Sequence, residues 1–409
     1  MDVLHERCAG LDVHKDEVVA CARTGAGSGV RRIHRRFKTT TRGLLELSDW
    51  LAEAGCTHVA MEATGVYWKP VWHVLEGGGF QLVLANARAV RNVPGRKSDM
   101  NDSTWLADLL AHGLIQGSFV PPEPVQRLRD LTRTRKQLVR EVVQHTQRIQ
   151  KTLEDANVKL SSVLSDTIGQ SGRQILAAII AGNSDPANLA ALVNYRVRTP
   201  RDEIAEALRG RVNDHHRFLL QLHLDQVDAL SSAIDKIDRH IEEQLHPFRE
   251  AAARLATIPG LSLTAAYVVL AEIGPEMSQF PTAAHLVSWA GLCPRMDESA
   301  GKVRTTRTRD GNPWLKTALV QSAWAAARKN GSYLRAQFHR IKVRRGAKKA
   351  AVAVAASLLT IAYHLLKSRS DYKDLGANYY DRRDQARTAK RLLKRLADLG
   401  IHLQVAAPA

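Results

Sequence analysis

Two carboxylates stand close together in a sequence that is otherwise strongly basic. Asp99 and Asp102 lie three residues apart in "GRKSDMNDSTWLADLL" (95–110), just before an apolar stripe. Residues at this spacing share one face of a helix, so their charges repel each other unless a cation or the positive end of the helix dipole offsets the repulsion. Acids that only complement the helix dipole are the simpler interpretation of an isolated pair. The pair gains a chemical meaning if other carboxylates converge on it.

Two further carboxylates lie in apolar strands. Asp12 is inside "AGLDVHK" and Glu62 closes "VAMEATG", where a carboxylate is costly unless it binds something. If these strands are neighbours in one sheet, the four carboxylates meet at one edge and can hold one or two Mg²⁺ ions, which prefer hard oxygen ligands. We expect three other acids to be surface or turn residues: Asp16, Glu17 and Asp108.

Alternating strands and helices must position these carboxylates. Short apolar runs predict strands, and amphipathic stretches predict helices. The predicted strands are 8–13, 17–23, 30–37, 57–64 and 80–86, and the predicted helices are 41–55, about 68–75 and a helix that begins near residue 98. The first two strands form a hairpin and the third is a more exposed edge strand. This order suits an α/β sheet of the ribonuclease-H kind.

A proline-rich stretch, "SFVPPEPVQ" (118–126), predicts a domain boundary, and the chain beyond it is helical. Two apolar stripes follow on otherwise charged helices. The first consists of Leu131, Leu138, Val142, Ile149 and Leu153, and the second of Val227, Leu230, Ile234, Ile237 and Ile241. The second has the spacing of a coiled-coil seam. Two helices packed within one subunit and a dimerising coil explain the stripes equally well.

The C-terminal part carries most of the positive charge. "LATIPGLSLTAAYVVLAEIG" (255–274) predicts two helices joined by a Pro-Gly turn, similar to a helix-hairpin-helix whose backbone N–H groups suit phosphate. Residues 301–350 hold 14 Lys or Arg against one acid, Asp310, so they supply +13 of the formal net charge of +18. We interpret this window as a nucleic-acid surface. Four aromatic residues lie among its charges: Trp314, Trp324, Tyr333 and Phe338.

Length, charge and cysteine content bound the class of protein. The 409 residues suffice for two or three domains, and the net charge of +18 favours a polyanionic partner. The four cysteines show neither zinc spacing nor a disulfide framework. With no signal peptide in the sequence, we expect a reduced, cytoplasmic chain that associates with the nucleoid when it acts. The apolar run 350–366 is predicted to be a packed helix with no role in a membrane.

Several motifs resemble a known family. "GLDVHKD", "MEATGVYWKP", "GRKSDMNDSTWLADLL" and "GSFVPPEPVQRLRDLTRTR" are closely similar to the N-terminal RuvC-like domain of DEDD transposases of the bacterial IS110 insertion-sequence family, in particular its IS1111 branch. The similarity continues in "IPGLSLTAAYVVLAEIG" and "LVSWAGLCPRMDESAGKVRTTRTRDGNPWLKTAL". The resemblance implies that the DEDD metal-binding set is Asp12, Glu62, Asp99 and Asp102. It also implies a recombinase guided by a structured bridge RNA of its own element, which pairs with donor and target DNA.

The resemblance further implies a catalytic serine in the C-terminal domain, which here is Ser299 in "DESAGKVR". From the residues alone, Ser299 is an ordinary loop serine, although the nearby Gly301 lets the backbone approach a ligand closely. A serine hydroxyl needs activation by a base or a metal, and the resemblance implies that the metal-bearing face of the RuvC-like domain supplies it. The candidate phosphate-binding cations that follow are Lys302, Arg304, Arg307, Arg309 and Lys316.

These observations predict a RuvC-like α/β domain (1–120), a helical coiled-coil domain (121–250), a mostly helical serine domain (251–370) and a basic helical tail (371–409). The predicted function is an RNA-guided, Mg²⁺-dependent DNA transposase or recombinase that forms a transient phosphoserine link. A dimer or tetramer is expected because recombination brings two duplexes together. One alternative is a RuvC-like junction endonuclease that hydrolyses DNA without Ser299. The other is a non-catalytic nucleic-acid scaffold whose basic C-terminal surface is its whole function.

Overall fold

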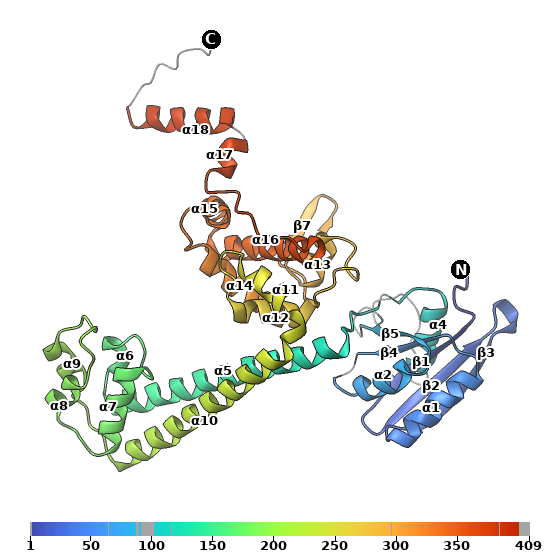
Figure 1. The fold of residues 1–409 in the computed structure, drawn as a ribbon, viewed down its shortest axis with the longest axis horizontal. Coiled ribbons are helices and arrows are strands. Elements are labelled where there is room, and N and C mark those ends of the chain that lie inside the picture. The colour runs from blue at the N-terminus through green and yellow to red at the C-terminus, as the bar shows by residue number, and fades with distance from the viewer. Residues whose placement is uncertain are drawn as a thin grey trace, which may run out of the picture. The chain divides into compact units, whose positions relative to one another are not determined.

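The computed structural model shows a chain that divides into two compact units, 1–120 and 121–409, which we describe separately. The described residues are 2–63, 65–86, 90, 102–115, 117–295, 297–383 and 385–400. Within them, the side chains of residues 297–299, 303, 304, 387, 388 and 391 are not described. Figure 1 shows the helices and strands with their labels.

The first unit is built on a mixed sheet of five strands in the order β3-β2-β1-β4-β5. The strands are β1 (Arg7–Val13), β2 (Glu17–Thr24), β3 (Arg31–Lys38), β4 (His58–Glu62) and β5 (Gln81–Ala85). Strands β1, β2 and β3 pair antiparallel, whereas β4 pairs parallel to β1 and β5 parallel to β4. The predicted hairpin and edge strand are confirmed. Strands β4 and β5 are each shorter than predicted, and residue 64 of the predicted strand 57–64 lies outside the described residues.

Helices cover both faces of this sheet (Figure 1). They are α1 (Thr41–Glu53), α2 (Trp68–Glu76) and α4 (Asp102–Ala111), with a short 3-10 turn, η1 (Gly27–Gly29), before β3. Side chains alternate along β1, so Leu11 packs with Leu47 of α1 and Leu75 of α2, while Cys8 packs with Leu110 of α4. The predicted start of the last helix near Ser98 lies outside the described residues, and the described helix begins at Asp102.

Helix α4 lies directly on β1 at Gly10. A Cβ at this position would lie 2.1 Å from the carbonyl oxygen of Ser103 and 2.5 Å from the backbone nitrogen of Ala107. We therefore expect Gly10→Ala to lower the free energy of unfolding by about 2–3 kcal/mol, since overpacking here must displace backbone rather than a flexible side chain. Urea denaturation of the full chain measures this change. An unchanged midpoint would contradict the close approach of α4 to β1.

The second unit begins with two long helices, α5 (Glu123–Asp155) and α10 (Asp214–Gln244), which pack antiparallel. Contacts between them join Arg135 to Asp238 near one end and Asp155 to His216 at the other, with His145 and His223 between. The two apolar stripes thus cover each other within the chain, which is the first of the two predicted alternatives. Four short helices at the far end enclose a core of their own: α6 (Leu160–Val163), α7 (Gln170–Ile180), α8 (Pro186–Ala191) and α9 (Arg201–Ala207).

The rest of the second unit is mostly helical. Its elements are η2 (His246–Phe248), α11 (Arg249–Ala256), α12 (Leu263–Ile273), α13 (Ala283–Trp289), β6 (Asp297–Ser299), β7 (Lys302–Thr305), α14 (Pro313–Ala326), α15 (Tyr333–Arg345), α16 (Ala347–Ser368), α17 (Tyr379–Arg383) and α18 (Gln385–Asp398). Among the described residues, α16 is the one helix long and apolar enough to cross a membrane, and 56% of its most apolar window is buried inside the unit. It packs against α13, α14 and α15.

Candidate active site

The carboxylates of β1 and β4 lie at the same end of the sheet. The parallel pairing of these strands sets Leu11 opposite Met61, so the next residues along each strand, Asp12 and Glu62, are neighbours in the same register. Both residues are half-buried. Parallel strands present equivalent positions on the same face, so the two side chains leave the sheet on the same side.

Asp102 reaches this end of the sheet from α4. The first turn of α4 lies over Gly10, because the carbonyl oxygen of Ser103 occupies the space beside the Gly10 Cα. Gly10 is two residues before Asp12, so both point to the face that α4 covers. The backbone positions of three of the four predicted carboxylates therefore lie at one end of one face of the sheet. The fourth, Asp99, lies outside the described residues.

The immediate surroundings of Asp12 are polar and open. Its Oδ2 lies 3.2 Å from the Nε2 of His14, and the side chains are 29% and 56% exposed, respectively. In the described ranges, no three His, Cys, Asp or Glu side chains come together as a group that could hold a metal ion. The converging donors are nevertheless hard carboxylate oxygens from three separate elements, which is the donor chemistry that Mg²⁺ takes. The residues present fit a divalent cation in kind.

Asp108 has a structural role that the sequence did not reveal. We predicted a surface or turn acid, but its carboxylate accepts hydrogen bonds from Arg23 at 3.1 Å and from Arg32 at 2.9 and 3.1 Å. Arg23 is 2% exposed and lies on β2, while Arg32 lies on β3. These bonds hold α4 on the sheet, which keeps Asp102 at the carboxylate end.

The three cysteines of the first unit are unsuited to act as nucleophiles or metal ligands. Burial raises the pKa of the Cys8 thiol to about 12 and that of Cys56 to about 11. Burial also raises the pKa of Cys21. These groups are therefore neutral thiols at physiological pH, which makes them poor nucleophiles and poor metal ligands.

Ser299 lies at the tip of a β-hairpin. Strands β6 and β7 pair antiparallel, and Ser299 is opposite Lys302 with only Ala300 and Gly301 between them. Both turn residues have positive φ, 50° and 73°, as a two-residue type I′ turn requires. Gly301 suits this conformation better than any other residue, and a Cβ there would meet no atom within 4 Å. The backbone of Ser299 thus stands where the hairpin meets open space.

The predicted phosphate-binding cations fall into two groups. Lys302, Arg307 and Arg309 are exposed around the hairpin, and the side chain of Arg304 is outside the described ones. Lys316 instead donates hydrogen bonds from its Nζ to the Thr308 hydroxyl at 2.6 Å and to the Gly291 carbonyl at 3.0 Å. It ties α14 to the segment that carries the hairpin. Asn312 caps α14 because its side chain accepts hydrogen bonds from the backbone nitrogens of Trp314 and Leu315.

The aromatic residues of the basic window are mostly packed. Phe338 is buried, and Tyr333 stacks on Tyr380 with ring centroids 5.5 Å apart. Arg133 and Arg140 lie over the ring of Trp314 at 5.6 and 5.2 Å. Trp324 is 40% exposed. Phe338 is thus outside any nucleic-acid surface that this window forms, since a position among charges does not show which face of a helix is covered.

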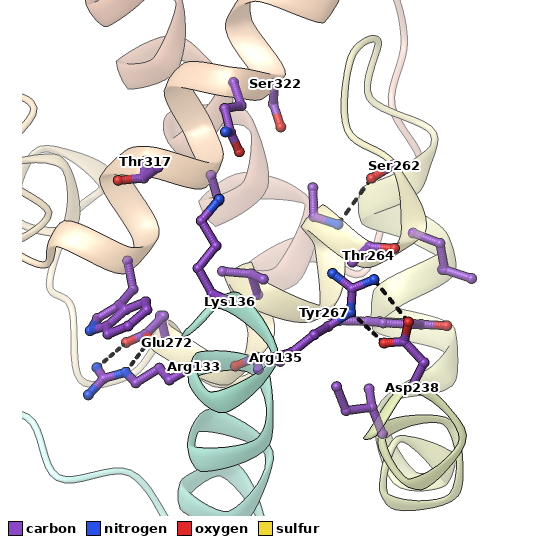
Figure 2. A pocket seen from close by; sticks show the side chains of 18 of the residues that line it. Arg133, Arg135, Lys136, Asp238, Ser262, Thr264, Tyr267, Glu272, Thr317 and Ser322 are labelled. Atoms are coloured by element: carbon purple, nitrogen blue, oxygen red, sulfur yellow. Dashed lines mark hydrogen bonds and ion pairs between the residues drawn. The ribbon is translucent and has the colours of Figure 1, made fainter. Parts of the chain in front are cut away.

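A buried ion-pair cluster joins α5 to the core of the second unit (Figure 2). Glu272 is fully buried at the end of α12 and accepts from Arg133 through both oxygens, each at 2.8 Å. Asn312 donates to the same carboxylate at 2.6 Å, and Arg129 donates to the Glu272 carbonyl at 2.8 Å. Burial lowers the pKa of Arg129, while Glu272 opposes that shift. We did not single out Glu272 from the sequence, although a carboxylate in the apolar run "VVLAEIG" was the available signal.

A cavity of about 450 Å³ lies beside this cluster and is lined by α5, α10, α12 and α14. In Figure 2, Lys136 extends from α5 toward α14, and the hydroxyls of Ser262 and Thr264 lie on the opposite side. The turn before α12, predicted as phosphate-binding, is thus part of the wall of this cavity. Its residues come from four separate segments, so no local pattern in the sequence could reveal it.

Comparison with known families finds two matching regions in this chain. A DEDD transposase model of IS110 elements matches residues 9–158, and the model of the transposase IS116/IS110/IS902 family matches residues 252–339. The chain belongs to the IS110 family of transposases. The first match contains the four carboxylates that we predict as the DEDD set, and the second contains Ser299 with the basic residues that follow it.

Three individual relatives agree with this family. The chain is 26% identical over 342 residues to "Insertion element IS110 uncharacterized 43.6 kDa protein" of Streptomyces coelicolor, covering 77% of this chain and 83% of that protein. It is 30% identical over 160 residues to "Putative transposase y4pF/y4sB" of Sinorhizobium fredii, covering 38% and 41%. It is 26% identical over 190 residues to "Pilin gene-inverting protein" of Moraxella bovis, covering 45% and 58%. The last two alignments span less than two thirds of those relatives.

Proposed function

We propose that this chain cuts and rejoins DNA strands through a metal-binding DEDD site in its first unit and a serine nucleophile in its second. The observation that carries the proposal is the placement of the residues Asp12, Glu62 and Asp102 at one end of one sheet face. The strand order β3-β2-β1-β4-β5, in which β2 runs antiparallel to the other four strands of the described sheet, supports a ribonuclease-H-like, RuvC-like assignment of this unit. Residue Asp99 completes the proposed set by family resemblance.

The proposed chemistry divides between the two units. The carboxylates would hold one or two Mg²⁺ ions, which when bound would polarise the scissile phosphate. Ser299 Oγ attacks phosphorus and loses its proton, the P–O bond to the DNA leaving group breaks, and that oxygen is protonated. The phosphoserine ester conserves the energy of the broken bond, so a DNA hydroxyl can later displace Ser299 and rejoin the strand without ATP. The exposed Lys302, Arg307 and Arg309 beside the hairpin suit contacts to the DNA phosphates.

We further propose that a structured RNA of the chain's own element guides the choice of donor and target DNA, and that the active form is a dimer or tetramer. Both proposals come from the family resemblance. The excess of positive charge, +18 over 409 residues, is compatible with binding RNA and DNA together.

The test is a covalent-adduct assay. The full chain is co-expressed with RNA from the non-coding flanks of its element, then incubated with labelled element-end duplex and Mg²⁺. We expect a DNA–protein adduct that survives denaturation, with the nucleotide mapped to the peptide that contains Ser299. Metal-dependent cleavage that leaves no adduct would contradict the serine mechanism and favour the junction endonuclease.

A further inference from the structure

Strand β3 is unusually basic for a strand. Five of its eight residues are cations, namely Arg31, Arg32, Arg35, Arg36 and Lys38, and every residue except Phe37 is exposed. It is the outer strand of the sheet, next to β2. Because side chains alternate along a strand, these cations divide between the two faces. The two faces of β3 therefore carry different sets of cations.

One face of β3 continues the row of the carboxylates. Val19 of β2 pairs with Asp12 on one side and with Arg36 on the other. Paired residues of antiparallel strands point to the same face, so Asp12 and Arg36 share a face and are two strand spacings, about 10 Å, apart. Lys38 lies two residues further along on this same face. Arg31 and Arg35 point to the opposite face.

Residues of helix α4 form hydrogen bonds with the other polar side chains on this face. Asp108 of α4 binds Arg32, and Thr104 hydrogen-bonds with the ring of His34 at 2.8 Å. Arg36 and Lys38 lie beyond this contact, toward the carboxylate end. Arg36 pairs with Glu17 at 3.2 Å, but both side chains are largely exposed, so the pair is worth little. In the described part of the chain, no ion pair or hydrogen bond involves the side chain of Lys38.

We propose that Arg36 and Lys38 bind the phosphate backbone of duplex DNA beside the scissile phosphate and position it at the carboxylate end of the sheet. This inference rests on the proposed function. A cluster of carboxylates repels the polyanion on which it must act, and cations on the same face offset that repulsion next to the reacting bond. Contacts of this kind fix the register of the duplex without reading its sequence.

Edge protection is the competing explanation for a charged outer strand, since charges on an edge prevent pairing with other strands. Edge protection involves the charges of the whole strand, so it predicts the same effect for substitutions on either face. DNA binding requires a difference, because Arg36 and Lys38 share a face with Asp12, beyond Arg32, which binds Asp108 of α4. The opposite face supplies a matched control, since it carries two exposed cations, Arg31 and Arg35.

The experiment compares two double variants of the full chain, Arg36→Gln with Lys38→Gln and Arg31→Gln with Arg35→Gln. Anisotropy of a labelled element-end duplex is titrated at several salt concentrations without divalent metal, so that catalysis plays no part. Each lost phosphate contact lowers the salt slope by about 0.9, which at 0.15 M salt weakens binding about fivefold. We expect about a 30-fold loss for the first variant and less than about a twofold loss for the second, whose cations point to the opposite face of the sheet. Glu17→Gln, which frees Arg36, is expected to tighten binding.

The outcomes separate cleanly. Equal losses in the two double variants would overturn the inference in favour of a general charge effect, and no loss in either would overturn it in favour of edge protection. If the first double variant lost affinity for an RNA duplex but kept its affinity for the DNA duplex, the assignment to DNA would be overturned. If the wild-type chain fails to bind duplex at any salt, the proposed function itself fails. Thermal melting of each variant confirms that the strand still folds.

Discussion

Asp12→Asn is expected to lower DNA strand cleavage by about 10⁴-fold, the scale at which loss of one member of a catalytic unit is felt. Asp12 lies in register with Glu62 and on the face that the first turn of α4 covers. An amide has the same shape as the carboxylate but lacks the charge that would hold a divalent cation. The side chain is 29% exposed, so the substitution leaves no buried group without a partner. Gel assays of cleavage in Mg²⁺ measure the rate.

The matched control is Asp16→Asn. Asp16 is exposed in the turn between β1 and β2, four residues from Asp12. Its substitution by asparagine removes the same charge. We expect cleavage by this variant within about twofold of the wild type, as for most surface substitutions. Asp102→Asn should match Asp12→Asn, and the double variant should be no worse, because members of one catalytic unit are not additive. Wild-type cleavage by Asp12→Asn would contradict a catalytic role for Asp12.

The sequence predicted the first unit well because its signals are local. Period-two alternation locates the strands, and a carboxylate inside an apolar strand, such as Asp12, marks a position with a function. The register that brings Asp12 beside Glu62 depends on non-local pairing, but the order of strands and helices was enough to expect it. The contact of α4 with Gly10 could not be predicted from the sequence, since nothing near Gly10 indicates which helix will cover it.

The second unit shows where sequence patterns fail. The seam of α5 and α10 could be predicted as apolar but not assigned to one chain or two, because the same spacing serves both. Phe338 lies among many charges in the sequence, yet it is 3% exposed, since helices α15 and α16 pack together on that side. Local charge density therefore says little about which side chains of a helix remain in solvent.

Glu272→Gln is expected to lower the free energy of unfolding of the second unit by about 3–5 kcal/mol, the usual cost of leaving a buried charge without its partner. The carboxylate of Glu272 is fully buried and binds Arg133 through both oxygens. A glutamine offers one oxygen, and its NH₂ group meets donors where Arg133 or Asn312 now donates. Urea denaturation followed by circular dichroism measures the total loss.

The control for this prediction is the ion pair of Arg135, which follows Arg133 two residues later on α5. Asp238→Asn removes the partner of Arg135, but here the side chains are 40% and 27% exposed, so water replaces the lost bond. We expect a loss below about 1 kcal/mol. The comparison isolates burial, because both carboxylates bind an arginine of the same helix through two hydrogen bonds.

The location of the loss is as informative as its size. Glu272 links α5 to α12 and to Asn312, which caps α14 directly after the segment that carries the Ser299 hairpin. Hydrogen exchange should therefore accelerate in the first turns of α5 and α14 in Glu272→Gln and stay unchanged in α7, whose core is separate. Uniform acceleration throughout the second unit would mean that Glu272 supports its global stability without a specific role in joining the long helices to the serine-bearing part.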